Sequence, residues 1–146
     1  MSKIGIVDLF AGCGGLTEGF EQHGQFKTVA AVEWESYPCQ TLAERLQSKW
    51  GYKNSEEIVL KFDMQRIEEL LNGWNDSNFG SNKGLLNLVN KYGPVDMVIG
   101  GPPCQAYSIA GRVRDKNGMK NDYRNYLFES YLKIVENLDF PKILVF

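Results

Sequence analysis

KIGIVDLFAGCGGLTEGF, residues 3–20, decides the fold class of this chain. The apolar run at residues 3–10 is closed by the glycine-rich turn AGCGG, and a helix is predicted over residues 16–24, ending at Gly24. Glycines at such a turn allow the backbone to bend sharply and to approach a ligand closely. The stretch therefore predicts a buried strand that enters a helix through a turn able to hold a ligand.

Strands and helices continue to alternate along the rest of the chain. Further strands are predicted at residues 27–33, 57–62, 95–100 and 142–146. Helices are predicted at residues 38–50, 65–72, 85–93 and 122–138. Residues 73–84 are rich in Gly, Asn and Ser and are predicted to form a surface loop. Nearly continuous apolar strands separated by helices predict an α/β fold with a doubly wound, mostly parallel sheet.

Length and composition restrict the class of protein. The 146 residues suit one domain, and the proportions of 43% hydrophobic and 23% charged residues are ordinary for a folded chain. No stretch approaches the roughly 18 apolar residues of a membrane span, and the N-terminus has no signal-peptide pattern. We therefore expect a cytoplasmic protein with no membrane partner.

Cysteine and histidine usage argues against a metal centre. Cys13, Cys39 and Cys104 are widely spaced and lack the paired CxxC spacing of zinc sites, and the chain has 1 histidine. No metal is expected. The net charge of −2 gives no compositional sign of nucleic-acid binding.

Acidic and aromatic residues follow the second and third predicted strands. Glu33 can accept hydrogen bonds from both ribose hydroxyls of a nucleoside, and Trp34 offers a flat apolar face for an adenine ring. Asp63 can accept a hydrogen bond from the adenine amino group. The carboxyl ends of parallel strands meet at one edge of a sheet, so these residues and the glycine turn should converge in one crevice. A solvated Glu33 and a core Trp34 beside an ordinary turn are the alternative.

Two adenosine cofactors fit this pattern, a nicotinamide dinucleotide and S-adenosylmethionine. A dinucleotide favours the complete G-x-G-x-x-G fingerprint for its pyrophosphate, but Thr17 stands in place of the third glycine. S-adenosylmethionine has no phosphate and carries a sulfonium cation, which suits the acids Asp8, Glu33 and Asp63. The balance favours S-adenosylmethionine.

VIGGPPCQAYSIAGR, residues 98–112, places a cysteine on a rigid mount just after the predicted strand at 95–100. Pro102 and Pro103 fix their own φ angles and restrict the residues before them. Cys104 is therefore expected at the sheet edge, beside the crevice. Its thiol can attack as a thiolate if a neighbour lowers the pKa from about 8.5. A buried, inert cysteine is the alternative.

Four stretches resemble the DNA (cytosine-5)-methyltransferase family in order and spacing: DLFAGCGGLTEGF, AAVEWE, DMVIGGPPCQAYSIAGR and NYLFESYLKIVENL. They match the first five family motifs over nearly the whole chain, and PPCQ is highly specific. The resemblance implies a Rossmann-like methyltransferase fold that binds S-adenosylmethionine, releases S-adenosylhomocysteine and uses no metal. It implies that the cofactor is bound by Phe10, Ala11, Gly12, Cys13, Gly14, Gly15, Glu33, Trp34, Asp63, Met64, Pro102 and Leu127.

The same resemblance implies that Cys104 is the catalytic nucleophile. Its thiolate would add to carbon 6 of a cytosine, so that carbon 5 can take the methyl group. The partner would be double-stranded DNA with the base flipped out of the helix, which suggests a nucleoid-associated protein. In the locally basic stretch 105–122, Gln105 and Ser108 would lie near the flipped nucleotide. Arg112 and Arg114 would contact phosphates, unless the stretch is an ordinary solvated loop.

The chain departs from the family pattern at its C-terminal end. It stops at PKILVF, where the family continues with Glu-Asn-Val, and the target-recognition domain and later motifs are absent. Residues 1–146 are therefore expected to be the N-terminal portion of the catalytic domain, with a sheet incomplete at its C-terminus and exposed apolar surface. Such a chain is expected to be inactive alone. It could be a truncated chain, a disrupted gene product, or one chain of a split enzyme whose second chain supplies the missing motifs.

Three other functions remain open from the sequence. A related branch of the family methylates cytosine in transfer RNA with the same nucleophile, although the Gln-Ala-Tyr-Ser sequence after Cys104 is more similar to the DNA branch. A non-catalytic chain of a split enzyme could bind only the cofactor or a partner. A nicotinamide-dependent oxidoreductase is the third alternative.

Overall fold

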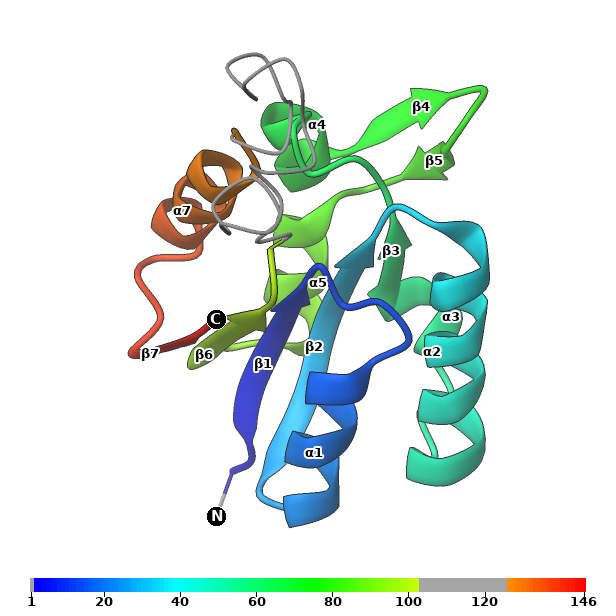
Figure 1. The fold of residues 1–146 in the computed structure, drawn as a ribbon, viewed down its shortest axis with the longest axis vertical. Helices are drawn as coiled ribbons and strands as arrows, with labels where there is room; N and C mark the ends of the chain where they lie inside the picture. The colour runs from blue at the N-terminus through cyan, green and yellow to red at the C-terminus, as the bar shows by residue number, and fades with distance from the viewer. Residues whose placement is uncertain (1, 103–125) are drawn as a thin grey trace, which may run out of the picture.

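A parallel sheet forms the centre of the molecule in the computed structural model, which describes residues 2–102 and 126–146. The strand order is β3-β2-β1-β6-β7, and every neighbouring pair is parallel (Figure 1). The strands are β1 (Ile4–Leu9), β2 (Phe26–Glu33), β3 (Val59–Lys61), β6 (Met97–Gly100) and β7 (Ile143–Val145). The α/β class and the parallel sheet are confirmed.

Helices cover both faces of this sheet, with α1 in front and α5 behind in Figure 1. The helices of the described residues are α1 (Gly15–His23), α2 (Ser36–Trp50), α3 (Ser55–Ile58), α4 (Ile67–Asn72), α5 (Leu85–Tyr92) and α7 (Leu127–Asn137). The alternation of side chains along β1 separates the faces, because successive residues of a strand point to opposite sides. Ile6 packs with Phe20 of α1, whereas Val7 and Leu9 belong to the larger core cluster.

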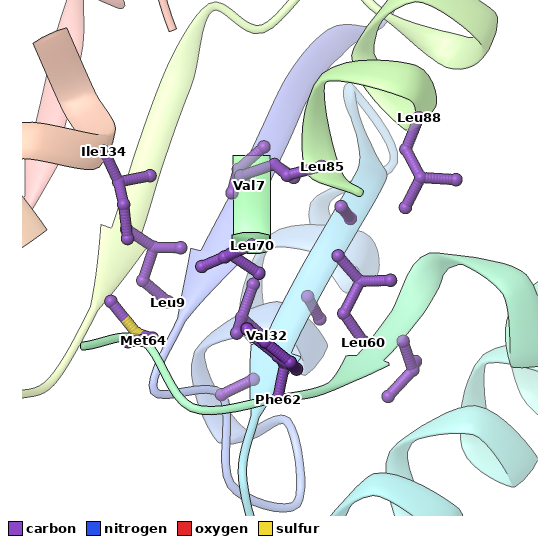
Figure 2. Packing of buried hydrophobic residues seen from close by; sticks show 14 of the residues in the cluster. Val7, Leu9, Val32, Leu60, Phe62, Met64, Leu70, Leu85, Leu88 and Ile134 are labelled. Atoms are coloured by element: carbon purple, nitrogen blue, oxygen red, sulfur yellow. The ribbon is translucent and has the colours of Figure 1, made fainter. Parts of the chain in front are cut away.

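The larger core cluster joins the strands to the helices that pack on them, including those that carry Leu70 and Leu85 (Figure 2). Its buried side chains include Val7, Leu9, Val32, Leu60, Phe62, Met64, Leu70, Leu85, Leu88 and Ile134. Burial of each large apolar side chain contributes about 1.5–3 kcal/mol relative to exposure. This core fixes the positions of the carboxyl ends of β1, β2 and β3.

The predicted strand at residues 57–62 is partly wrong. Residues 55–58 form the short helix α3, and the strand is limited to Val59–Lys61, which pairs with Ala31–Glu33. The Glu57 carboxylate accepts hydrogen bonds from Lys91 Nζ (2.8 Å) and Tyr92 Oη (2.5 Å) at the end of α5. These long-range contacts stabilise residues 55–58 as a helical turn, and strand β3 begins only at Val59.

Most of residues 73–84 lie at the surface as predicted, but the prediction of a loop is wrong because they contain a hairpin. Strands β4 (Trp74–Asp76) and β5 (Gly80–Asn82) pair antiparallel beside the sheet (Figure 1). Trp74 is only 6% exposed, and its ring stacks on Phe62 with 4.0 Å between centroids. One aromatic side chain thus anchors an otherwise polar stretch to the core.

Among the described residues, β3 and β7 are the edge strands of the sheet. Large apolar side chains are exposed around β7, namely Phe140, Ile143, Leu144 and Phe146. The apolar surface expected at this end of the sheet is therefore present. Within the part of the chain that the structure describes, no helix combines the length and the apolar character needed to cross a membrane.

Candidate nucleotide-binding site

The glycine turn after β1 curls over the carboxyl end of β2. Phe10 and Gly12 both adopt positive φ angles, 61° and 55°, so that the chain reverses within a few residues. The amide of Ala11 donates to the carbonyl of Val32 at 3.0 Å, and the amide of Gly12 donates to Glu33 Oε2 at 2.8 Å. The turn predicted from the sequence is therefore fixed directly to the strand that carries Glu33.

Gly14 occupies a position that only glycine can fill. Its φ angle is +83°, and a Cβ atom there would lie 2.3 Å from Cδ1 of Leu42. Leu42 is fully buried in the core beneath the turn, so it has little room to move. The turn and α2 are packed together at this point.

Glu33 organises the site through backbone amides. Besides Gly12, it binds the amides of Trp34 (2.9 Å) and Glu35 (3.0 Å) through Oε1. Glu35 is the residue before α2, so one carboxylate links the glycine turn to the start of that helix. The sequence indicated only a ribose ligand here and missed this bracing role. Carboxylate oxygens have about four lone-pair sites in total, so Glu33 keeps capacity for a further donor.

A cavity of about 290 Å³ opens at this edge of the sheet. It is lined by Phe10, Glu33, Trp34, Phe62, Asp63, Met64, Gln65, Gly101 and Leu127. This volume lies at the lower end of the range for small-molecule sites, roughly 300–1,000 Å³. The position, beyond the carboxyl ends of parallel strands, is where α/β sheets bind ligands.

The cavity brings together half of the residues expected around the cofactor. Phe10, Glu33, Trp34, Asp63, Met64 and Leu127 line it, whereas Ala11, Gly12, Cys13, Gly14, Gly15 and Pro102 do not. Sequence reasoning missed Phe62, Gln65 and Gly101. Phe62 and Gln65 immediately flank Asp63 and Met64, so their position next to the third strand was the available signal.

Asp63 begins a tight turn on the wall of the cavity. Its Oδ1 accepts the amide of Gln65 at 2.9 Å, and its carbonyl accepts the amide of Arg66 at 3.1 Å. The side chain thus shapes the turn on which it sits. Trp34, which follows the neighbouring strand β2, also lines the cavity and is 51% exposed.

Asp8 lies beneath the glycine turn and not among the residues that line the cavity. It is 1% exposed, and its Oδ2 accepts a hydrogen bond from Thr17 Oγ1 at 2.5 Å. Its Oδ1 has no hydrogen-bond partner among the described residues. Burial is the main cause that raises the pKa of Asp8 to about 6. Asp8 therefore does not join Glu33 and Asp63 as an open acidic ligand.

The two cysteines that the structure describes differ in accessibility. Cys13 is exposed on the glycine turn, and Arg45 Nη1 donates to its carbonyl at 3.0 Å. Cys39 is buried and its Sγ donates to the Glu33 carbonyl at 3.4 Å. Burial raises the pKa of the Cys39 thiol to about 11, so this thiol stays protonated and unreactive.

The remaining predicted residues lie outside the described residues: Cys104, Gln105, Ser108, Arg112 and Arg114. The chain leads toward them from β6, whose neighbour Gly101 lines the cavity, and Pro102 is half-buried. Among residues 2–102 and 126–146, no group of three or more His, Cys, Asp or Glu side chains could hold a metal ion.

The sequence matches one family model, described as C-5 cytosine-specific DNA methylase, over residues 4–146. The chain is 35% identical to the type II methyltransferase M.Bpa9945I of Bacillus paralicheniformis, over 97% of this chain and 39% of that protein. It is 33% identical to the type II methyltransferase M1.HphI of Haemophilus parahaemolyticus, over 98% of this chain and 32% of that protein. The chain thus spans well under half the length of these relatives.

The fold is also similar to a solved structure. A triple mutant of DNMT2 from Spodoptera frugiperda superposes with a TM-score of 0.57 and 21% sequence identity. The match covers 98% of this chain and 35% of that chain. At this identity the likeness concerns the fold alone.

Proposed function

This chain belongs to the C-5 cytosine-specific DNA methylase family, and we propose that its protein transfers a methyl group from S-adenosylmethionine to carbon 5 of a cytosine in DNA. The observation that carries the proposal is the cavity at the carboxyl edge of the sheet. It lies between the glycine turn, the end of β2 and the strand that leads to the PPCQ sequence.

The cavity suits the adenosine end of S-adenosylmethionine. It offers the aromatic faces of Phe10 and Trp34 for an adenine ring, and the carboxylates of Glu33 and Asp63 for ribose hydroxyls and an exocyclic amine. Met64 and Leu127 would complete the apolar wall. When bound, the cofactor supplies an electrophilic methyl group on its sulfonium sulfur.

The glycine turn would contribute differently. Ala11, Gly12, Cys13, Gly14 and Gly15 are proposed to shape the path of the cofactor through their backbone. The hydrogen bonds of Ala11 to Val32 and of Gly12 to Glu33 support a preorganised turn. Pro102 is proposed to meet the cofactor from the β6 side.

Cys104 is proposed as the nucleophile. Its Sγ, as the thiolate, forms a bond to carbon 6 of cytosine, and the electron pair of the ring double bond makes carbon 5 nucleophilic. After carbon 5 is methylated, loss of its proton restores the double bond and expels the thiolate. Pro102 and Pro103 support the proposal, because a nucleophile must be held to within about half an ångström of its productive attack position.

Double-stranded DNA is the proposed substrate, with the target base flipped out of the stack. Gln105 and Ser108 would contact the flipped nucleotide, and Arg112 and Arg114 would contact phosphates. The support is the local excess of basic residues in the stretch 105–122 of a chain whose net charge is −2. A DNA substrate would place the protein at the nucleoid, and the names of the bacterial relatives favour a restriction-modification role.

Residues 1–146 are proposed to be the N-terminal portion of the catalytic domain, inactive without the remaining motifs. The support is the share of each relative that the chain spans, 39% and 32%. The proposed partner is the segment that carries those motifs, on a second chain or on the same polypeptide. The open strand β7 and the exposed side chains of Ile143 and Leu144 offer a surface for it.

Transfer of a labelled methyl group tests the function. The protein, together with the chain that carries the remaining motifs, is incubated with labelled S-adenosylmethionine and either duplex DNA or transfer RNA. Label in 5-methylcytosine of DNA is the expected result. Label in transfer RNA alone would favour the RNA branch, and label in neither acceptor would contradict the methyltransferase proposal.

A further inference from the structure

Residues 62–65 form one wall of the cavity, and the next residue, Arg66, makes contacts on the side of this wall away from the cavity. Phe62, Asp63, Met64 and Gln65 all line the cavity, and Arg66 follows directly, before α4 begins at Ile67. The Arg66 amide closes the turn by donating to the Asp63 carbonyl at 3.1 Å. The Arg66 backbone is therefore part of the turn that carries the wall.

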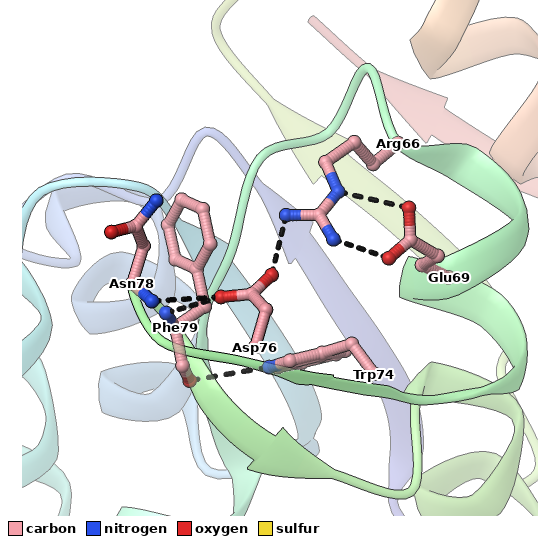
Figure 3. A network of polar contacts seen from close by, with 6 residues as sticks. All are labelled: Arg66, Glu69, Trp74, Asp76, Asn78 and Phe79. Atoms are coloured by element: carbon pink, nitrogen blue, oxygen red, sulfur yellow. Dashed lines mark hydrogen bonds and ion pairs between the residues drawn. The ribbon is translucent and has the colours of Figure 1, made fainter.

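The Arg66 guanidinium joins three parts of the molecule (Figure 3). Its Nη1 bonds Asp76 Oδ2 of β4 at 2.6 Å, and its Nε and Nη2 bond the two Glu69 oxygens of α4, Nε at 2.9 Å. Its central carbon lies 4.7 Å from the centre of the Phe62 ring. This guanidinium thus links the hairpin, the helix and the cavity wall.

Asp76 is also held in place by hydrogen bonds within the hairpin, independently of Arg66. Its Oδ1 accepts the amides of Asn78 (2.9 Å) and Phe79 (2.8 Å), which shapes the hairpin turn (Figure 3). The pKa of Asp76 lies below its usual value because of the Phe79 amide first and Arg66 second, so the pair stays charged at neutral pH. Trp74 Nε1 donates to the Phe79 carbonyl at 3.2 Å across the hairpin.

Aromatic packing carries this rigidity into the cavity. Phe62 stacks on Trp74 at 4.0 Å and meets the edge of Phe79 at 5.0 Å between centroids. One face of the cavity wall therefore rests on the hairpin, while Arg66 tethers the same hairpin to the Asp63 turn. The polar stretch that the sequence suggested to be a surface loop is a support for the site.

A partly exposed ion pair contributes little to global stability, so the Arg66–Asp76 pair is not explained by the free energy of unfolding alone. The side chains of Arg66 and Asp76 are 33% and 24% exposed, a range in which solvent screens the attraction strongly. The bidentate contact with Glu69 and the stacking over Phe62 instead restrict the position of the guanidinium. Positional precision is what a ligand-binding wall requires.

We propose that Arg66, through its ion pair with Asp76 on the β4–β5 hairpin, is a positioning residue that sets the Asp63–Gln65 wall for the adenine end of the cofactor. This inference rests on the proposed cofactor site. Arg66 does not line the cavity, so its effect is carried by Asp63 and Phe62.

The test is a double-mutant cycle read out by ligand affinity. S-adenosylhomocysteine and adenosine are titrated by calorimetry into the protein together with the chain that carries the remaining motifs, for the unmodified protein, Arg66→Ala, Asp76→Asn and the double variant. We expect each single variant to weaken both ligands by about ten-fold, and the double variant to be no weaker than Arg66→Ala. Equal effects on the two ligands locate the defect at the adenosine end.

A second ion pair provides the matched control. Lys91 and Glu57 are joined at 2.8 Å, are 54% and 39% exposed, and tie α5 to α3, and neither residue lines the cavity. Lys91→Ala and Glu57→Gln are expected to change the melting temperature as much as the Arg66 variants do, and to leave ligand affinity within about two-fold.

The possible results distinguish a failure of the Arg66 positioning role from a failure of the proposed cofactor site. If the unmodified protein binds neither ligand, the proposed cofactor site is wrong and the inference falls with it. If the unmodified protein binds both ligands and the Arg66 and Asp76 variants bind as tightly as the control variants, the inference alone is overturned. Should Arg66→Ala fail to fold, the isosteric Asp76→Asn decides by the same comparison.

Discussion

The residues at and just after the carboxyl end of β1 include a buried carboxylate, Asp8, and a glycine with a positive φ angle, Gly14. Gly14 takes a left-handed backbone against Leu42, and Asp8 is buried with one carboxylate oxygen unpaired among the described residues. The buried Asp8 carboxylate costs stability, whereas glycine adopts the left-handed conformation without strain. Both residues lie next to the glycine turn and outside the lining of the candidate cofactor cavity. Strained or poorly solvated residues gather at functional sites because function, not stability, fixes them there.

Gly14→Ala should lower the free energy of unfolding by roughly 1–3 kcal/mol, because the new Cβ meets Leu42 at a positive φ angle. Gly19→Ala is the matched control, since this glycine lies within α1 with open space around it. The control should gain about 0.5–1 kcal/mol. Urea denaturation of both variants measures the difference, and equal effects would contradict the packing described for the turn.

Asp8→Asn should change the pH dependence of stability. The folded pKa of about 6 lies above the value of 3.8 for the free side chain, so ionised Asp8 destabilises the folded state. That cost is absent below pH 3.8, grows as the pH rises through this window, and is complete above the folded pKa. At about 1.36 kcal/mol for each pH unit, it amounts to about 3 kcal/mol.

The variant should therefore gain stability relative to the unmodified protein between pH 4 and pH 7. Denaturation curves at several pH values give this difference directly. A difference that is constant across this range would show that Asp8 is not buried in its charged form.

At the scale of elements, the β4–β5 hairpin and the short strand β3 form the least predictable part of the fold. The hairpin is held by the stacking of Trp74 on Phe62 and by the Arg66 network. In each support a β4 residue, Trp74 or Asp76, contacts a residue outside the hairpin, Phe62 or Arg66. The hairpin should therefore be sensitive to changes in the core beneath it.

Trp74→Ala should destabilise the protein by about 3–5 kcal/mol, since it removes a buried indole from the core. Trp34→Ala should cost less than about 1 kcal/mol, because that ring is 51% exposed, and should instead weaken S-adenosylhomocysteine binding. Chemical denaturation and ligand titration of the two variants check the contrast. The reverse order of stabilities would contradict the placement of the two rings.

Local patterns predicted the elements whose residues carry their own signal. The apolar run of β1, the glycine turn and Glu33 at the end of β2 follow from spacing along the chain. The hairpin does not, because Trp74 finds its partner Phe62 only in the folded molecule. The same holds for Glu57, which Lys91 and Tyr92 draw into a helical turn, and for Glu33, whose amide contacts depend on how the turn closes.

At the scale of the whole molecule, the sheet is well packed in its centre and open at β7. The exposed apolar residues Phe140, Ile143, Leu144 and Phe146 surround that open strand. Exposed apolar side chains concentrated at one strand suggest a contact with another part of a protein or with a partner. The proposed partner is the chain that carries the remaining family motifs.

Residues 1–146 alone should transfer no labelled methyl group to DNA, and addition of a chain with the missing motifs should restore transfer. Replacing Leu144 with Lys, which places a charge on the open strand, should weaken that restoration. Lys142→Ala is the neighbouring control outside β7. Methyl transfer by residues 1–146 alone would refute the proposed division of the site.

The most direct measurement is covalent trapping of the protein, with its complementing chain, on a duplex that carries 5-fluorocytosine at the target site. Fluorine cannot leave carbon 5 as the proton does, so the bond between Cys104 and carbon 6 should persist after methyl transfer. We predict a denaturant-resistant adduct that needs S-adenosylmethionine, disappears in Cys104→Ser and survives in Cys13→Ser. An adduct that persists in Cys104→Ser, or methylation of ordinary cytosine by that variant, would contradict the assignment of the nucleophile.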